Sequence, residues 1–157
     1  MYCVDTNIFI DWWSRLYPPD VFPTLVQNVE ELARAGRIAA PDSVYIEIGR
    51  VGSPPLRAWA KSQRGIFRPH NSELQAETAN IVKSYRQLID SESFHEEADP
   101  FLIALAKINK WTVVTHETSA KLKKHPKRSL YIPDVCIKEE IPCITLVEMM
   151  RREKWRF

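Results

Sequence analysis

The sequence predicts an α/β protein of three layers, in which helices cover both faces of a central, mostly parallel β-sheet. Short apolar segments alternate along the chain with longer segments whose apolar residues recur at helical spacing. This alternation favours a parallel sheet, because each return to a parallel strand requires a crossover, usually a helix. The length of 157 residues, 45% of them hydrophobic, fits a single domain over residues 1–157 with a core of ordinary size.

Strands are expected where short apolar runs end at turn-forming residues. These runs are residues 2–4, 37–40, 111–115, 130–132 and 143–146. Trp111–Thr115 is the clearest, because it is nearly continuous in apolar and β-branched residues, as in a strand buried on both faces.

Helices are expected between these strands. Their ranges are 8–13, 20–35, 41–48, 56–62, 72–89, 99–108 and 147–155, with a polar linker at 91–97. Asp20 and Asn71 are expected to cap two of them, and Asp99-Pro100 combines a capping carboxylate with a proline at the first helical position. Pro18-Pro19 and Ala35-Gly36 end the first two helices.

Charge is unevenly distributed along the chain. The formal net charge is +2, but residues 1–117 carry 12 basic and 15 acidic side chains, whereas residues 118–157 carry 10 and 5. Such a division suits a protein that holds cations at one place and phosphates beside it. Three Cys without metal-binding spacing indicate a reducing compartment, and no segment approaches the roughly 18 apolar residues of a membrane helix. We therefore expect a cytoplasmic protein that does not contact membranes.

Acidic residues follow the predicted strands, where parallel sheets bind their ligands. Asp5 follows the first strand, Glu117 lies two residues beyond the 111–115 strand, and Asp134 follows the strand expected at 130–132. Glu47 and Asp99 add carboxylates in or beside apolar segments. Hard cations with oxygen ligands neutralise such a group best, so Mg²⁺ or Mn²⁺ is the expected cofactor.

Each carboxylate also has a structural interpretation. Asp5 could cap the first helix, as could the two residues that follow it. Glu47 could pair with Arg50 one helical turn further on. Asp99 before a proline is an ordinary helix start, and Glu117 lies in a turn that is polar throughout.

Four motifs contain these residues and cover nearly the whole chain. They are Val4-Asp5-Thr6-Asn7-Ile8, Glu47 in a central helix, Ala98-Asp99-Pro100 with the apolar run to Ala106, and Val113-Val114-Thr115-His116-Glu117. In this order and spacing they resemble the PIN-domain family of metal-dependent nucleases. The ending, with Ile132-Pro133-Asp134-Val135-Cys136 and Trp155-Arg156-Phe157, is similar to a PIN-like subfamily of largely uncharacterised proteins.

The resemblance implies an α/β/α fold and an acidic pocket in which one or two Mg²⁺ or Mn²⁺ ions support phosphodiester hydrolysis, usually of RNA. Asp5 and Asp99 would bind the principal ion, with Glu47 and Glu117 ligating a second ion or orienting its waters. Asp134 is an extra candidate. The last motif of the family usually has Asp where this chain has Glu117, which leaves the number of ions open.

Polar residues beside the carboxylates complete the expected site. Thr6, Asn7 and Thr115 are expected to hydrogen-bond the carboxylates or the phosphate and so fix the ligands. Thr6 and Asn7 are also good helix caps.

A basic segment follows the last motif. Its cationic residues are Lys121, Lys123, Lys124, Lys127 and Arg128. We expect phosphate contact, since Lys and Arg supply most of the non-specific affinity for nucleic acids, while a solvated loop is the alternative. Arg64, Arg68 and His70 could extend this surface.

The resemblance also bears on partners, because many small members of the family are toxins of toxin–antitoxin pairs. It implies an endoribonuclease toxin with a protein antitoxin, and a homodimer is expected. Trp12, Trp13 and Trp59 are more typical of a core or an interface than of base stacking, and either partner could cover them.

Two other functions compete with this hypothesis. A haloacid-dehalogenase-like phosphatase also begins with an apolar strand and Asp, but it needs a second Asp two residues later, where this chain has Asn7. A nuclease-like fold that binds RNA without cleaving it is the second alternative, although all four acidic positions are filled.

Overall fold

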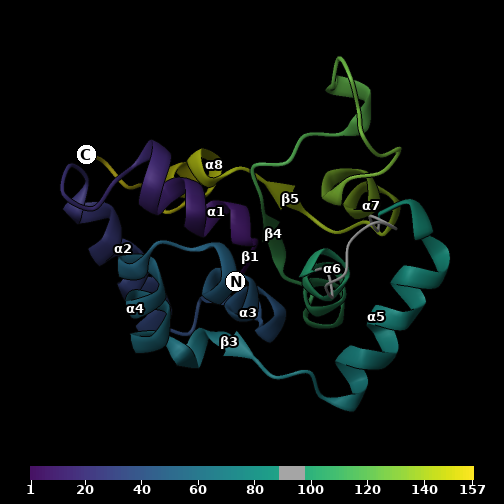
Figure 1. Ribbon diagram of the computed structural model, residues 1–157, viewed down its shortest axis with the longest axis horizontal. Helices are drawn as coiled ribbons and strands as arrows, with labels where there is room; N and C mark the ends of the chain where they lie inside the picture. Colours follow the sequence, from purple (N-terminus) through teal and green to yellow (C-terminus); the bar gives the residue numbers. More distant parts are fainter. Residues whose placement is uncertain (89–97) are drawn as a thin grey trace.

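A parallel five-stranded sheet forms the centre of the computed structural model, which describes residues 1–88 and 98–157 (Figure 1). The strands are β1 (Tyr2–Val4), β2 (Ile38–Pro41), β3 (Phe67–Arg68), β4 (Thr112–Val114) and β5 (Cys143–Ile144). They lie in the order β3-β2-β1-β4-β5, and every neighbouring pair is parallel. The predicted parallel sheet is therefore confirmed.

Helices cover both faces of this sheet, which confirms the predicted three-layer α/β/α fold. They are α1 (Thr6–Asp11), α2 (Pro23–Arg34), α3 (Asp42–Val51), α4 (Pro54–Ser62), α5 (Ser72–Ser84), α6 (Ala98–Asn109), α7 (Ile132–Lys138) and α8 (Leu146–Arg152). Four short helical turns complete the described elements: η1 (Trp12–Leu16), η2 (Arg64–Ile66), η3 (Arg86–Leu88) and η4 (Ala120–Leu122). None of the described helices is long and apolar enough to cross a membrane.

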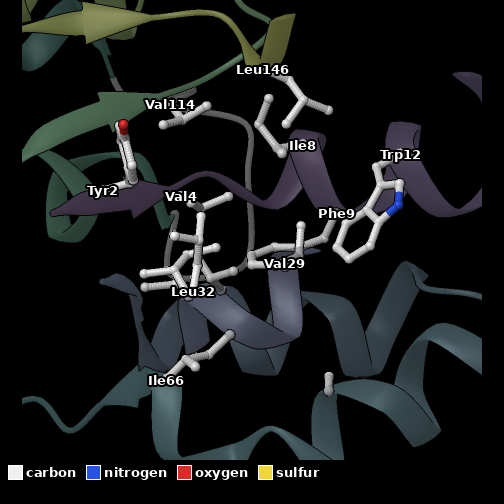
Figure 2. Close-up of a cluster of buried hydrophobic side chains, with 14 of the residues drawn as sticks. Tyr2, Val4, Ile8, Phe9, Trp12, Val29, Leu32, Ile66, Val114 and Leu146 are labelled. Atoms are coloured by element: carbon white, nitrogen blue, oxygen red, sulfur yellow. The ribbon is translucent and has the colours of Figure 1, made fainter. Parts of the chain in front are cut away.

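Two hydrophobic clusters fill the spaces between the layers. One takes side chains from α1 to α4 and α8, and the other takes them from α5, α6 and α7. Successive residues of β1 alternate between them, because side chains of a strand point to opposite faces of the sheet. Tyr2 and Val4 belong to the first cluster, which Figure 2 shows, and Cys3 belongs to the second.

The segment at 130–132 is not a strand, contrary to the prediction. Helix α7 begins at Ile132, with Tyr131 at its N-cap and Pro133 in its first turn. Proline suits that position because the first amide groups of a helix have no partner within the helix. The carboxylate of Asp134 accepts a hydrogen bond from the backbone N–H of Tyr131 at 2.9 Å and so closes the turn. Asp134 therefore follows no strand.

Several predicted helix ends also differ from the structure. Asp20 does not cap α2, because this helix begins at Pro23 with Phe22 at the N-cap. Asn71 caps α5 as predicted, but α5 ends at Ser84. Helix α6 begins at Ala98, so Asp99 lies within its first turn. Residue 89 and the linker predicted at 91–97 lie outside the described residues.

The tryptophans form part of the core. Trp12 and Trp59 are buried and cross each other edge to face at 5.3 Å between ring centroids, and the half-buried Trp13 packs beside both. Phe9 contacts Trp12, Trp59 and Phe67. The alternative of an interface role is therefore wrong for Trp12 and Trp59.

We predict that Phe9→Ala lowers the free energy of unfolding by about 3–5 kcal/mol, because it removes a fully buried ring and leaves a cavity among other rings. Urea denaturation measures the change. Val21→Ala is the control, since Val21 is 62% exposed and its truncation should cost less than about 0.5 kcal/mol. Equal effects of the two substitutions would contradict this description of the core.

Candidate active site

The candidate site lies where the chain changes sides of the sheet. From β1 the chain runs outward through β2 and β3, and then returns to β4 on the other side of β1. Ligands of such sheets bind at this switch point, beyond the carboxyl ends of the strands. Val4 pairs with Val114 in register, so the next residues, Asp5 and Thr115, emerge side by side.

Asp5 is the buried acid of this site. It is 4% exposed, and its backbone N–H donates to the carbonyl of Val114 at 3.0 Å, which continues the pairing of β1 with β4. Asp5 occupies the N-cap position of α1, but its side chain makes no capping hydrogen bond. The capping interpretation therefore does not explain this carboxylate.

Two polar side chains hold the Asp5 carboxylate. Its Oδ2 atom accepts hydrogen bonds from Asn7 Nδ2 at 2.5 Å and from Thr115 Oγ1 at 2.7 Å. Asn7 Oδ1 accepts from the backbone N–H of His116 at 3.0 Å, and Thr115 Oγ1 accepts from that of Glu117 at 3.0 Å. The network thus joins the start of α1 to the segment after β4 and fixes the orientation of the acid.

Burial raises the pKa of Asp5 to about 7. The hydrogen bond from Thr115 lowers the pKa, whereas the negative charges of Glu117 and Glu47 raise it further. Asp5 therefore lies in the field of two further carboxylates, and a cation at Asp5 would relieve both the burial and the repulsion.

Glu47 reaches this group from α3. Its Oε2 atom accepts a hydrogen bond from Thr6 Oγ1 at 2.6 Å. Among the described residues Glu47 forms no ion pair with Arg50, so the structural alternative for this acid is not seen. Thr6, like Asn7 and Thr115, contacts a predicted carboxylate, while the role of all three toward a metal stays a prediction.

The guanidinium of Arg128 contacts the carboxylates of both Asp99 and Glu117. Arg128 Nη1 lies 3.3 Å from Asp99 Oδ2, and Arg128 Nη2 lies 3.2 Å from Glu117 Oε1. The same Nη1 atom donates to the carbonyl of Leu88 at 2.6 Å. Arg128 was expected to contact nucleic acid with its neighbours, but it turns inward. Nothing in the sequence distinguishes it from the nearby lysines.

Asp134 has a structural role in the chain. Its carboxylate accepts hydrogen bonds from the Ser119 hydroxyl, from the Ala120 N–H at 3.0 Å and from the Tyr131 N–H at 2.9 Å. Burial raises its pKa, but these hydrogen bonds outweigh burial and hold the pKa below its ordinary value. Asp134 thus ties the segment after β4 to the start of α7.

The lysines of the basic segment remain near the surface. Lys121, Lys124 and Lys127 are exposed, and the Lys123 ammonium lies 4.3 Å above the ring of Tyr131. Figure 1 shows the segment between β4 and α7 protruding from the body of the molecule. Its lysines can therefore meet a large anion without rearrangement of the core.

Arg64 and His70, two of the three residues considered as an extension of this surface, have partners within the chain. Arg64 pairs with Asp42 at 2.7 Å. The ring of His70 accepts a hydrogen bond from the N–H of Ser43 and stacks on Phe101, with 4.0 Å between centroids. These contacts explain Arg64 and His70 without a nucleic acid.

The donors at Asp5 fit a hard cation in their chemistry. The carboxylates of Asp5 and Glu47 are oxygen ligands of the kind that Mg²⁺ and Mn²⁺ prefer, whereas Asn7 turns the Nδ2 of its amide toward Asp5. Across residues 1–88 and 98–157, no group of three or more His, Cys, Asp and Glu side chains is spaced to hold a metal ion. The ligand roles of Asp5, Glu47, Asp99 and Glu117 toward a metal therefore stay predictions.

Comparisons with known proteins place the chain in a family. A family model described as "Domain of unknown function (DUF4411)" matches residues 2–157. The chain belongs to the DUF4411 family. A comparison of this DUF4411 chain with curated proteins found no match.

One solved structure shows a distant similarity in fold. It is the crystal structure of VapBC2 from Rickettsia felis bound to a DNA fragment from their promoter. The alignment covers 83% of this DUF4411 chain and 95% of that chain, with 20% sequence identity and a TM-score of 0.48.

We predict that Asp5 makes the metal-free protein less stable as the pH rises. An unfolded Asp ionises near its ordinary pKa of 3.8, whereas folded Asp5 keeps its proton up to about pH 7. The folded state therefore binds more protons between these values, and the free energy of unfolding falls as the pH rises through them. The loss should be on the order of 4 kcal/mol above pH 7.

Asp5→Asn removes this titration and is the matched comparison. Urea denaturation in EDTA, at several pH values from about 4 to 8, gives the free energy of unfolding of each protein. The difference, wild type minus variant, should fall as the pH rises, since the contributions of groups that do not interact with Asp5 cancel. A difference that stays constant over this range would contradict the assigned environment of Asp5.

Proposed function

We propose that this protein is a Mg²⁺- or Mn²⁺-dependent endoribonuclease that hydrolyses phosphodiester bonds, and that it is the toxin of a type II toxin–antitoxin pair. One observation carries the proposal. A buried Asp5, held by Asn7 and Thr115, lies within the field of two further carboxylates at the switch point of a parallel sheet. Burying such charge together is costly unless a cation compensates it.

The side chains of the site would act by holding and orienting the reacting groups. Asn7 and Thr115 fix the Asp5 carboxylate, and Thr6 fixes Glu47, as polar groups around metal ligands do. Asp99 would complete the acidic pocket from α6. A divalent cation bound there would supply an activated water and stabilise the charge that develops on the scissile phosphate.

The basic segment would supply the affinity for RNA. Lys121, Lys124 and Lys127 lie exposed on the protruding segment that starts at the site, and their charges are available to successive phosphates. The chain therefore places acidic and basic surfaces next to each other, as its charge distribution predicts.

Partners are part of the proposal as well. Leu16, Val21 and Phe157 are exposed apolar side chains at the end of the molecule that contains η1 and the C-terminus, and a protein antitoxin or a second copy would cover them (Figure 1). We propose a cytoplasmic location for the pair, where RNA is the available substrate.

The phosphatase alternative is disfavoured by the contacts of Asn7. A general acid would be required at this position, but an amide has no proton to transfer at neutral pH. The Nδ2 of Asn7 instead donates to Asp5 and Thr115, and its Oδ1 accepts from the N–H of His116. Binding of RNA without cleavage remains as the outcome that would replace the proposed activity.

We predict that Asp5→Asn and Asp99→Asn each lower the rate of RNA cleavage by at least about 100-fold, because each removes a negative ligand of the proposed cation. The measurement is cleavage of a mixed RNA pool by purified protein with Mn²⁺, with Mg²⁺ or with EDTA. Asp20→Asn is the control, since Asp20 is exposed and caps no helix.

Cleavage that survives EDTA and both substitutions would exclude the proposed mechanism. Cleavage of DNA but not RNA would keep the metal chemistry and replace the substrate. RNA binding without cleavage under any metal condition would favour the non-catalytic alternative. Growth arrest on expression, relieved by Asp5→Asn but not by Asp20→Asn, is the result expected of a toxin.

A further inference from the structure

The guanidinium of Arg128 occupies the space between two of the proposed metal ligands. Each of its terminal nitrogens faces a different carboxylate, Nη1 with Asp99 at 3.3 Å and Nη2 with Glu117 at 3.2 Å. A planar guanidinium presents its donors at fixed angles, so it can bridge two acids as a small cation does.

Both carboxylate oxygens of Glu117 have partners within the chain. Its Oε1 atom faces Arg128, and its Oε2 atom accepts a hydrogen bond from the backbone N–H of Ile132 at 3.0 Å. Its own N–H donates to Thr115. A metal ion that approaches this carboxylate therefore meets the positive charge of Arg128 on one oxygen and the N–H of Ile132 on the other.

Arg128 is held in place from other directions as well. Its Nη1 atom donates to the carbonyl of Leu88 at 2.6 Å, and its guanidinium carbon lies 4.9 Å from the centre of the Tyr131 ring. The side chain is 22% exposed, unlike the open side chains of Lys124 and Lys127. These contacts from η3 and the start of α7 make Arg128 a built part of the pocket.

We propose that Arg128 takes the place of a second metal ion, so that this protein binds one divalent cation, at Asp5, while Glu117 anchors Arg128 and does not ligate metal. Arg128 is thereby a positioning residue of the site. This inference rests on the proposed metal-dependent function and names how many ions it uses. A guanidinium between these acids repels a divalent ion that would bridge Asp99 and Glu117, since like charges a few ångströms apart in a partly buried site interact strongly, while Asp99 stays a proposed ligand of the ion at Asp5.

The experiment measures the number of Mn²⁺ ions that the full-length protein binds, by titration with detection of free Mn²⁺ by electron paramagnetic resonance. We expect the wild type to bind one ion and Arg128→Gln to bind two. The dissociation constant of the second ion on Arg128→Gln should be at least about tenfold lower than that of any weaker, second binding seen with the wild type. Arg128→Lys keeps the charge and should bind one ion. Lys124→Gln, which removes an exposed charge from the same segment, should also bind one.

Glu117→Gln tests the anchoring role. Alone it should leave one ion bound, because Glu117 is not a ligand of that ion, and in the Arg128→Gln background it should remove the second. Circular dichroism of each variant checks that it is folded. If Arg128→Gln unfolds, Arg128→Lys still tests the proposal, because two ions bound by folded Arg128→Lys would overturn it.

Two results would overturn the inference directly: two Mn²⁺ ions on the wild type, or one ion on Arg128→Gln as on Lys124→Gln. Loss of all Mn²⁺ binding in Asp5→Asn is expected from the proposed function itself. If Asp5→Asn binds Mn²⁺ like the wild type while Arg128→Gln gains an ion, the proposed centre at Asp5 fails and the competition at Arg128 stands. The two ideas are therefore separable.

Discussion

The Asp5 carboxylate accepts hydrogen bonds from Asn7 in the first turn of α1 and from Thr115 directly after β4, and the bond from Thr115 joins the end of β1 to the end of β4. The other groups of the site are placed relative to these bonds. They depend on the register of the sheet, because Val4 must lie beside Val114 for the following residues to meet. Burial disfavours the charge of this carboxylate, and the hydrogen-bond donors around it offset part of that cost. This buried carboxylate is the centre of the proposed cation site.

The acidic and basic parts of the chain meet at the same pocket. Arg128, from the basic C-terminal part, lies between Asp99 and Glu117 of the acidic part, while the neighbouring lysines remain on the outside. Arg128 thus pairs a charge of the basic part of the chain with two charges of the acidic part. The protruding segment is fixed at its base by Asp134, so the separation between its inward Arg and its outward Lys side chains is set by structure.

Much of the fold and the centre of the site could be predicted from local sequence. The sequence predicts the strand ends that precede Asp5 and Thr115, because buried parallel strands are apolar and polar residues follow at their carboxyl ends. The prediction of a strand at 130–132 is wrong, since a short apolar run does not distinguish a strand from a helix start. The inward turn of Arg128 and the burial of Trp12 depend on contacts between distant segments, which spacing along the chain does not encode. The same limit applies to Asp134, whose partners at 119, 120 and 131 are defined only once the segment closes.

The most direct test of the central claim is the anomalous scattering of Mn²⁺ in crystals of the wild-type protein grown or soaked in Mn²⁺. We expect an anomalous peak within coordinating distance of the Asp5 carboxylate, with Asn7 and Thr115 still bonded to it and with Arg128 still between Asp99 and Glu117. A peak that lies away from Asp5, or none at Mn²⁺ concentrations that saturate binding in solution, would contradict it.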